Sequence, residues 1–203
     1  MGDRAPTVFV VDDDPAVGDS IRLLLRSVGL RSEVYLSGDE FLAAYEADRP
    51  GCLVLDIRMP GMSGIEVQER LRELGSTLPI IFVTAHGDVP MAVDAMKAGA
   101  LDFLEKPFRD QELLDKIRQA LDHDARIRDE RSAVAEIEER LSTLTPRETE
   151  VMELVVAGKS NKRIARELGI SRRTVEVHRA RVMEKMGVDS VSRLVQLVMR
   201  AKE

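Results

Sequence analysis

The run Val8-Phe9-Val10-Val11, which leads directly into Asp12-Asp13, decides the fold of this chain. A short β-branched run bounded by polar residues is typical of a buried strand. The arrangement recurs at Cys52–Leu55 before Asp56, at Ile80–Val83 before Thr84, and at Leu101–Glu105 before Lys106-Pro107. Because the carboxyl ends of parallel strands meet at one edge of a sheet, these polar residues are expected to converge.

Amphipathic stretches of roughly a dozen residues separate the runs as far as residue 109, which is the pattern of βα units around a parallel sheet. Five strands are expected. Asp14-Pro15 predicts a capped helix start, and Ser37–Glu40 and Ser63–Glu66 read as capping boxes. One buried face of the first helix is predicted, ending at Gly29. Its residues are Val17, Ile21, Leu24, Leu25 and Val28.

The composition describes a soluble globular protein. The chain has 203 residues, of which 44% are hydrophobic, so it is long enough for two small domains. Its single cysteine, Cys52, excludes an internal disulfide and is predicted to be a buried hydrophobic residue. We find no apolar targeting stretch and no segment with the length of a membrane span, so we expect a cytoplasmic protein without a membrane partner.

The charge is divided unevenly along the chain. Residues 1–123 hold 13 basic and 22 acidic residues, a net charge of −9, whereas residues 142–203 hold 13 basic and 8 acidic residues, a net charge of +5. This asymmetry predicts partners of opposite character, with nucleic acid as the candidate for the basic part. We therefore expect a first domain over residues 1–122, a linker over 123–141 and a second domain over 142–203.

The charge-dense linker continues a helical pattern that begins at Asp110. Four apolar residues within it have helical spacing, namely Ile127, Val134, Ile137 and Leu141. A helix that pairs weakly with another element and a solvated linker helix both fit this pattern.

Four short helices are expected after Leu141. They open at Thr145, which starts a capping box with Pro146 at the first helical position, at Ser160, at Ser171, and at Asp189 or Ser190. A tight turn containing Gly169 joins the second helix to the third, which gives a helix-turn-helix unit.

The convergent residues suggest phosphoryl chemistry. Three carboxylates at one edge repel one another unless a hard cation such as Mg²⁺ binds them through oxygen, and a carboxylate can act as a nucleophile toward phosphorus. Lys106 would then hold one phosphoryl oxygen and the Thr84 hydroxyl would donate to another. Taken singly, each aspartate also fits a helix cap or a loop.

With these motifs, residues 7–120 resemble the receiver domain of two-component response regulators. Met59–Gly64 after Asp56 is a further match. The resemblance implies a flavodoxin-like α/β fold with strand order 2-1-3-4-5, and phosphorylation of Asp56 by a sensor histidine kinase. It also implies that Asp13, Asp56 and the carbonyl of Arg58 bind Mg²⁺ with help from Asp12, and that Thr84 and Phe103 move on activation. Arg58 and His86 vary within that family and are candidates for controlling hydrolysis.

Residues 142–201 resemble the LuxR-type helix-turn-helix module, and the Gly87–Val93 loop resembles the FixJ-type subfamily. The motifs are Leu144–Val151, Gly158–Lys162, Ile164-Ala165 and Ser171–His178. The outward face of the helix from Arg172 to Lys185 is expected to enter the major groove of duplex DNA, with the start of the preceding helix on the phosphates. The candidate contacts are Lys159, Asn161, Lys162, Arg173, Thr174, Glu176, Val177, Ala180 and Arg181.

The expected function is that of a transcription factor switched by phosphorylation, which dimerises through the receiver and binds two DNA half-sites. It is not expected to be an enzyme beyond its own phosphoryl transfer and slow dephosphorylation. Two alternatives remain open: a phosphatase that uses an aspartyl-phosphate, and a constitutive DNA-binding protein whose receiver is a dimerisation scaffold.

Overall fold

The computed structural model describes residues 5–85 and 89–201. The chain divides into two compact units, Met1–Arg128 and Asp129–Glu203, which are treated separately below. His86, and with it the prediction about hydrolysis at that position, lies outside the described residues.

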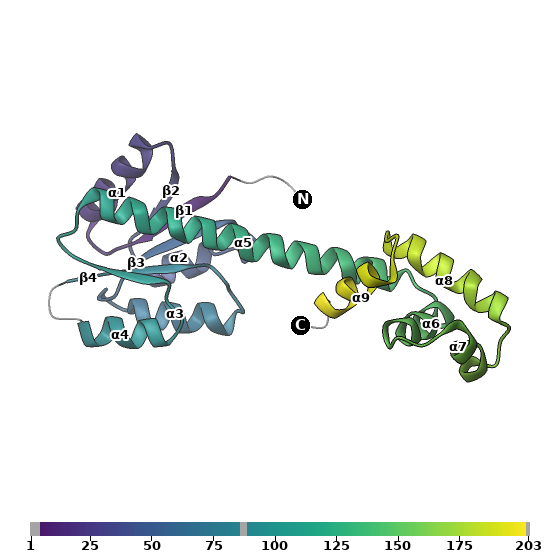
Figure 1. Ribbon diagram of the computed structural model, residues 1–203. Coiled ribbons are helices and arrows are strands. Elements are labelled where there is room, and N and C mark those ends of the chain that lie inside the picture. The colour runs from purple at the N-terminus through teal and green to yellow at the C-terminus, as the bar shows by residue number, and fades with distance from the viewer. Residues whose placement is uncertain (1–4, 86–88, 202–203) are drawn as a thin grey trace. The chain divides into compact units, whose positions relative to one another are not determined.

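The first unit is a doubly wound α/β fold (Figure 1). Its strands are β1 (Thr7–Val11), β2 (Arg31–Tyr35), β3 (Gly51–Asp56), β4 (Ile80–Thr84) and β5 (Asp102–Glu105). Its helices are α1 (Pro15–Ser27), α2 (Gly38–Ala44), α3 (Gly64–Glu73), α4 (Val89–Lys97) and the first part of α5 (Asp110–Ser142). Every described pairing is parallel and the strand order is β2-β1-β3-β4-β5, which confirms the predicted topology.

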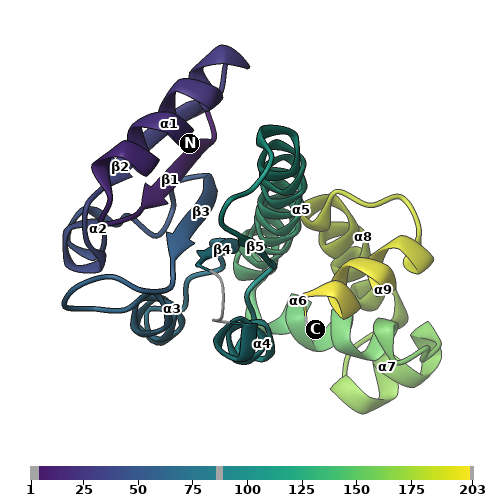
Figure 2. The ribbon, with the colours of Figure 1, turned by 90° about the vertical axis from the view of Figure 1, so that its left-hand side faces the viewer.

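Alternate residues of the strands feed two separate cores. Val8 and Val54 point to the side covered by α1 and α5, whereas Phe9 and Leu55 point to the side covered by α2, α3 and α4. Figure 2 shows these two groups of helices on opposite sides of the sheet. Because β1, β3 and β4 are buried on both faces, their sequences read as continuous apolar runs rather than as alternating ones.

The helix starts follow the predicted caps with one exception. Asp14 accepts from the backbone N–H of Ala16, and Ser63 and Glu66 form a complete capping box. Ser37 caps α2, but Glu40 accepts from the backbone N–H of Leu36 rather than from that of Ser37, so the predicted box at this helix is wrong in its second half.

The predicted buried face of α1 is also wrong at its last position. Ile21 and Leu25 are buried, but α1 ends at Ser27, so Val28 lies beyond the helix and is 40% exposed.

The second unit is helical. It comprises the last turns of α5 with α6 (Pro146–Val156), α7 (Asn161–Leu168), α8 (Arg172–Met186) and α9 (Val191–Arg200). The four predicted helices are confirmed, with α9 capped by Ser190. Val151, Ile164, Val175 and Met186 lie at the centre of its core. None of the helices in the described ranges combines the length and the apolar character that a membrane crossing requires.

The first part of the charge-dense stretch of α5 is packed rather than solvated. Asp124 is 2% exposed, and its Oδ2 accepts from the backbone N–H of Gly51 and from Nε of Arg128. Arg128 also donates to the carbonyls of Asp48 and Arg49. These contacts fasten the helix to the amino end of β3 within the first unit.

Candidate functional site

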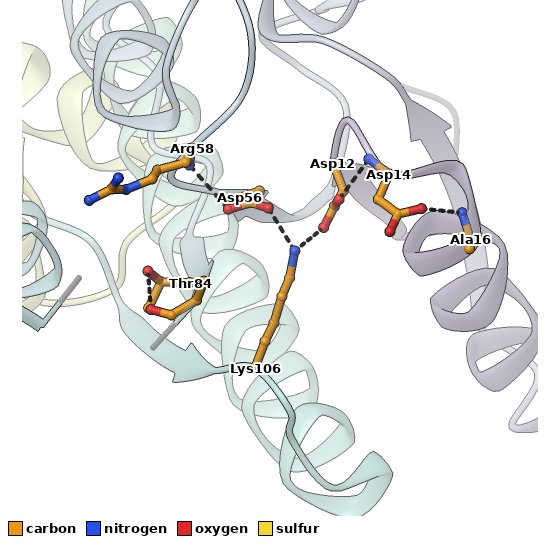
Figure 3. A network of polar contacts seen from close by, with 8 residues as sticks. Asp12, Asp14, Ala16, Asp56, Arg58, Thr84 and Lys106 are labelled. Carbon is orange, nitrogen blue, oxygen red and sulfur yellow. Dashed lines mark hydrogen bonds and ion pairs between the residues drawn. The ribbon is translucent and has the colours of Figure 1, made fainter. Parts of the chain in front are cut away.

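The carboxyl edge of the sheet gathers the polar residues that the strand pattern predicts there (Figure 3). Asp12 follows β1, Asp56 ends β3, Thr84 ends β4 and Lys106 follows β5. Asp12, Asp56 and Thr84 are buried, whereas Asp13 is exposed. The fold therefore holds a buried polar centre with one carboxylate facing solvent.

Lys106 joins the two buried carboxylates of this centre. Its Nζ lies 2.6 Å from Oδ2 of Asp12 and 2.6 Å from Oδ2 of Asp56. The backbone N–H of Asp14 donates to Oδ1 of Asp12, at 3.0 Å, and that of Arg58 donates to Oδ1 of Asp56, at 3.1 Å. Because both oxygens of each carboxylate are engaged, the two groups have a fixed orientation (Figure 3).

Burial and charge act against each other at this centre. Burial raises the pKa of Asp12 above its ordinary value, in spite of the opposing hydrogen bond from Lys106. Burial alone would lower the pKa of Lys106, but its hydrogen bonds to Asp12 and Asp56 raise that pKa above its ordinary value. Lys106 is therefore an ammonium at neutral pH, and its hydrogen bond does not fully offset the effect of burial on the pKa of Asp12.

The carboxylates fit a divalent cation. Asp12, Asp13 and Asp56 each place one oxygen within 4.8 Å of the others. Three carboxylates against the one ammonium of Lys106 leave an excess negative charge that a divalent ion balances. Oxygen donors of this kind are the ligands that Mg²⁺ prefers.

The other predicted residues of the site lie around this centre. The hydroxyl of Thr84 donates to the carbonyl of Ala85, at 3.3 Å, and the carbonyl of Thr84 accepts from the backbone N–H of Lys106. Phe103 is half-buried on β5 and packs against the core on the α3 and α4 side of the sheet. The side chain of Arg58 is exposed.

Gly64 packs against the backbone carbonyl of Asp56, a contact that the sequence pattern did not predict. A Cβ atom on Gly64 would lie 2.2 Å from the carbonyl oxygen of Asp56. The backbone N–H of Gly64 also donates to the carbonyl of Ile57, at 3.0 Å. The start of α3 therefore packs directly on the end of β3. The position immediately after an N-cap tolerates larger residues in most helices. The glycine that follows the Ser63 cap is therefore the signal that could have revealed this contact.

The second unit holds a helix-turn-helix formed by α7 and α8. Gly169 ends α7 with φ of 66°, a conformation that glycine adopts without strain, and Ser171 caps α8 by accepting from the backbone N–H of Thr174. Val175, Val182 and Met186 are buried on one face of α8. The opposite face exposes the predicted contacts Arg173, Glu176, Val177, Ala180 and Arg181, while Thr174 is half-buried.

The start of α7 engages its polar side chains within the unit. Nζ of Lys159 lies 2.6 Å from Oε2 of Glu167, and Asn161 accepts from Nη1 of Arg179. Arg179 is half-buried and hydrogen-bonded within the unit. Lys162 is exposed. Among the three predicted phosphate contacts at the start of α7, Lys159 and Asn161 have partners within the unit, whereas the side chain of Lys162 projects into solvent.

Comparison with known protein families identifies both domains. A model of the response regulator receiver domain matches residues 8–118, over half of the chain, and a model of bacterial regulatory proteins of the luxR family matches residues 142–198. The chain belongs to the response regulators. It is a transcriptional regulator with a receiver domain and a LuxR-type DNA-binding domain, and not a classical enzyme.

Full-length relatives share this organisation. The response regulator is 47% identical over 203 residues to the response regulator protein TodT of Pseudomonas putida, covering all of this chain and 89% of that protein. It is 47% identical over 194 residues to the transcriptional regulatory protein FixJ of Bradyrhizobium diazoefficiens, covering 96% and 95% of the two chains.

Two solved structures extend the comparison. The structure of the response regulator StyR is 50% identical with a TM-score of 0.90, covering 97% and 99% of the two chains. Full-length FixJ from B. japonicum is 46% identical with a TM-score of 0.61, covering 97% of each. Receiver domains typically bind Mg²⁺ at an acidic site and imply a histidine kinase partner, and LuxR-type domains imply DNA binding.

A partly buried ion pair holds α6 to α8 in this response regulator. Glu148, at the third position of α6, is 2% exposed and lies 2.7 Å from Nζ of Lys185. The same carboxylate accepts from the backbone N–H of Thr145 as the second half of a capping box. The hydrogen bond from Lys185 is the largest cause that lowers the pKa of Glu148 to about 2.

The stability of the DNA-binding domain is therefore expected to depend on acid pH. Because the folded pKa lies below the ordinary value of 4.5, the Glu148 carboxylate stabilises the fold fully above that value and loses its contribution as pH falls toward 2. Urea unfolding of the Glu148→Gln variant, followed by NMR signals of α6 and α8, should show a lower stability at pH 7 and a weaker loss between pH 4.5 and 2.5 than in the unaltered protein. A variant at exposed Glu153, Glu153→Gln, is the control; equal acid sensitivity in all three proteins would contradict the role of Glu148.

Proposed function

We propose that Asp56 accepts a phosphoryl group from a sensor histidine kinase with Mg²⁺, and that this promotes dimerisation through the receiver and sequence-specific binding to duplex DNA. The observation that carries the proposal is the ammonium of Lys106 between the carboxylates of Asp12 and Asp56, beside the exposed carboxylate of Asp13. A fixed cation beside a fixed carboxylate is suited to hold a transferred phosphoryl group.

Asp56 would be the nucleophile of the phosphoryl transfer, and its neighbours would hold the metal ion. An oxygen of Asp56 attacks the phosphorus of a phosphohistidine, the new O–P bond forms as the P–N bond breaks, and the imidazole nitrogen keeps the electron pair. Asp12, Asp13, Asp56 and the carbonyl of Arg58 would hold Mg²⁺, which when bound supplies positive charge to the phosphoryl oxygens.

Two further side chains then receive the new group. Lys106, freed from sharing its charge with the bare Asp56 carboxylate, pairs with one phosphoryl oxygen, and the hydroxyl of Thr84 turns to donate to another. That rotation would alter the packing of Phe103 and the surface around Lys97 and Leu101, where a second receiver would bind. Phosphorylation shifts the equilibrium between the two conformations of Thr84, because the phosphoryl group interacts differently with each of them.

In the DNA-binding domain, α8 would enter the major groove. Its exposed face carries Arg173 near the helix start, where side chains reach base edges, and Val177, whose apolar side chain suits a thymine methyl group. The remaining candidate contacts on this face are Thr174, Glu176, Ala180 and Arg181. Lys162, with Lys159 and Asn161, would contact the phosphates.

Removal of the metal provides a direct test. Incubation of the purified protein with a small phosphodonor and Mg²⁺ should incorporate close to one phosphoryl group per chain, and chelation of divalent ions should reduce incorporation to background, because the clustered carboxylates would repel the incoming anion. Intact-mass spectrometry measures the product.

Two results of this experiment would contradict the proposal. Incorporation that is unchanged after chelation would show that no divalent ion is needed. Continuous multiple turnover of small phosphate esters, rather than stoichiometric labelling, would favour the phosphatase alternative.

A further inference from the structure

The last turns of α5 belong to the core of the DNA-binding unit. Ile137 is 4% exposed within the same apolar cluster as Val151, Val175 and Met186, and Leu141 packs against that cluster. These residues precede the stretch that the luxR family model matches, which begins at residue 142. The helical core of this unit therefore extends backwards into the segment that the sequence pattern assigned to a linker.

Arg140, on the same turns, is bound to the end of α8. Its Nη1 donates to the carbonyl of Met186, the last residue of α8, at 3.1 Å, and its Nη2 lies 2.6 Å from Oε1 of Glu136. The last carbonyls of a helix have no partner within the helix and carry partial negative charge, so a guanidinium at this place satisfies one of them and interacts favourably with the helix dipole.

A second contact joins the same two segments. Nζ of Lys185, on α8, donates to the carbonyl of Thr143, at 2.9 Å, just after α5 ends. The guanidinium of Arg140 also packs against Gly187, where a Cβ atom would lie 3.2 Å from Nη1 of Arg140. The carboxyl end of α8 is thus fixed to α5, while its amino end, with Arg173, is exposed.

We propose that Arg140 is a positioning residue for DNA binding, which sets the orientation of α8 by holding its carboxyl end to the last turns of α5. The inference rests on the proposed role of α8 as the helix that reads DNA. A helix held at one end and presenting the other end to a groove changes its contacts along the whole face when the held end is released. Arg140 is placed at the end of α8 far from Arg173, so it acts on binding without touching DNA.

The test measures DNA affinity of the full-length protein by fluorescence anisotropy over a range of salt concentrations. The probe is a duplex selected from random sequences for binding to the unaltered protein. Arg140→Ala should weaken binding about threefold to tenfold, the scale of a cation lost from a helix C-terminus in a partly buried site. The slope of log K against log salt concentration should not change, because no phosphate contact is lost. Arg140→Lys should restore part of the affinity.

Two further variants separate this inference from the function on which it rests. Arg131→Ala removes an exposed arginine of α5 and should bind as the unaltered protein does. Arg173→Ala should weaken binding, because it removes a side chain that is placed to reach base edges. If Arg173→Ala has no effect, the proposed DNA-reading role of α8 fails.

The inference itself is overturned in two ways. If Arg173→Ala weakens binding but Arg140→Ala matches Arg131→Ala, then Arg140 does not position α8. If Arg140→Ala lowers the salt slope by a unit, Arg140 contacts phosphate directly. Amide hydrogen exchange over α6 to α8 identifies a variant that has lost its fold. If Arg140→Ala has lost it, the DNA affinity of Arg140→Lys decides whether Arg140 positions α8.

Discussion

Replacing Asp56 by asparagine is expected to reduce phosphoryl incorporation from close to one group per chain to background. An amide oxygen or nitrogen is a poor nucleophile toward phosphorus, so the acyl phosphate cannot form at this position. Oδ1 of Asp56 accepts from the backbone N–H of Arg58 and Oδ2 accepts from Nζ of Lys106, so the single amide oxygen of asparagine can keep one of these two hydrogen bonds while the side chain keeps its size. We therefore expect the fold of the receiver to persist while its chemistry is lost.

The Asp56→Asn substitution is also expected to change metal binding. Asp56→Asn removes one of three clustered carboxylates, so the affinity for Mg²⁺ should fall. The control is Asp19→Asn, which removes an exposed carboxylate of α1 that is ion-paired with Arg22 and lies outside the cluster. Incorporation in Asp56→Asn equal to that in Asp19→Asn would place the phosphoryl group on another residue and contradict the proposal.

Replacing Gly64 by alanine is expected to damage the receiver through its backbone. The added Cβ would meet the carbonyl oxygen of Asp56 at 2.2 Å, a distance that no side-chain rotation can relieve because the obstacle is main chain. Overpacking of this kind costs about 1–3 kcal/mol of stability, and more when the backbone must move. Because the displaced atom belongs to Asp56 itself, phosphoryl incorporation should slow in molecules that still fold.

A second helical glycine provides the comparison. In Gly18→Ala the new Cβ would meet a side-chain methyl group of Val34, at 2.7 Å, rather than backbone. Since a side chain can adjust, and alanine favours a helix over glycine, the loss of stability should be smaller and the rate of incorporation unchanged. Urea unfolding and labelling kinetics of both variants measure the difference; an equal effect of the two substitutions would show that contact with the Asp56 carbonyl is not special.

The strands and the polar centre at the carboxyl edge of the sheet could be predicted from sequence because their signals are local. The three central strands β1, β3 and β4 read as apolar runs. The rule that parallel strands end at one edge brings Asp12, Asp56 and Lys106 together although they are far apart in the chain. The burial of one face of α8 follows equally from helical spacing alone. Pattern and topology together therefore predicted that these polar residues lie close together, as they do in the structure.

Long-range contacts made by the charged side chains of helices could not be predicted in this way. The pairs Asp124 with Gly51, Arg140 with Met186, and Lys185 with Glu148 each join segments that are distant in sequence. A charge-dense helix such as α5 presents many acids and bases with equivalent helical spacing, so the sequence does not indicate which of them are buried. For the same reason the linker pattern did not reveal that Ile137 lies in a core.

Phosphorylation of Asp56 is proposed to control DNA binding, and one comparison tests this link most directly. DNA affinity and oligomeric state of the full-length protein are measured with and without a phosphodonor in the presence of Mg²⁺, for the unaltered chain and for Asp56→Asn. We predict that the phosphodonor raises both affinity and the fraction of dimer for the unaltered protein and changes neither for Asp56→Asn. Affinity that is indifferent to the phosphodonor and to Asp56→Asn would contradict the account and favour a constitutive DNA-binding protein whose receiver is a dimerisation scaffold.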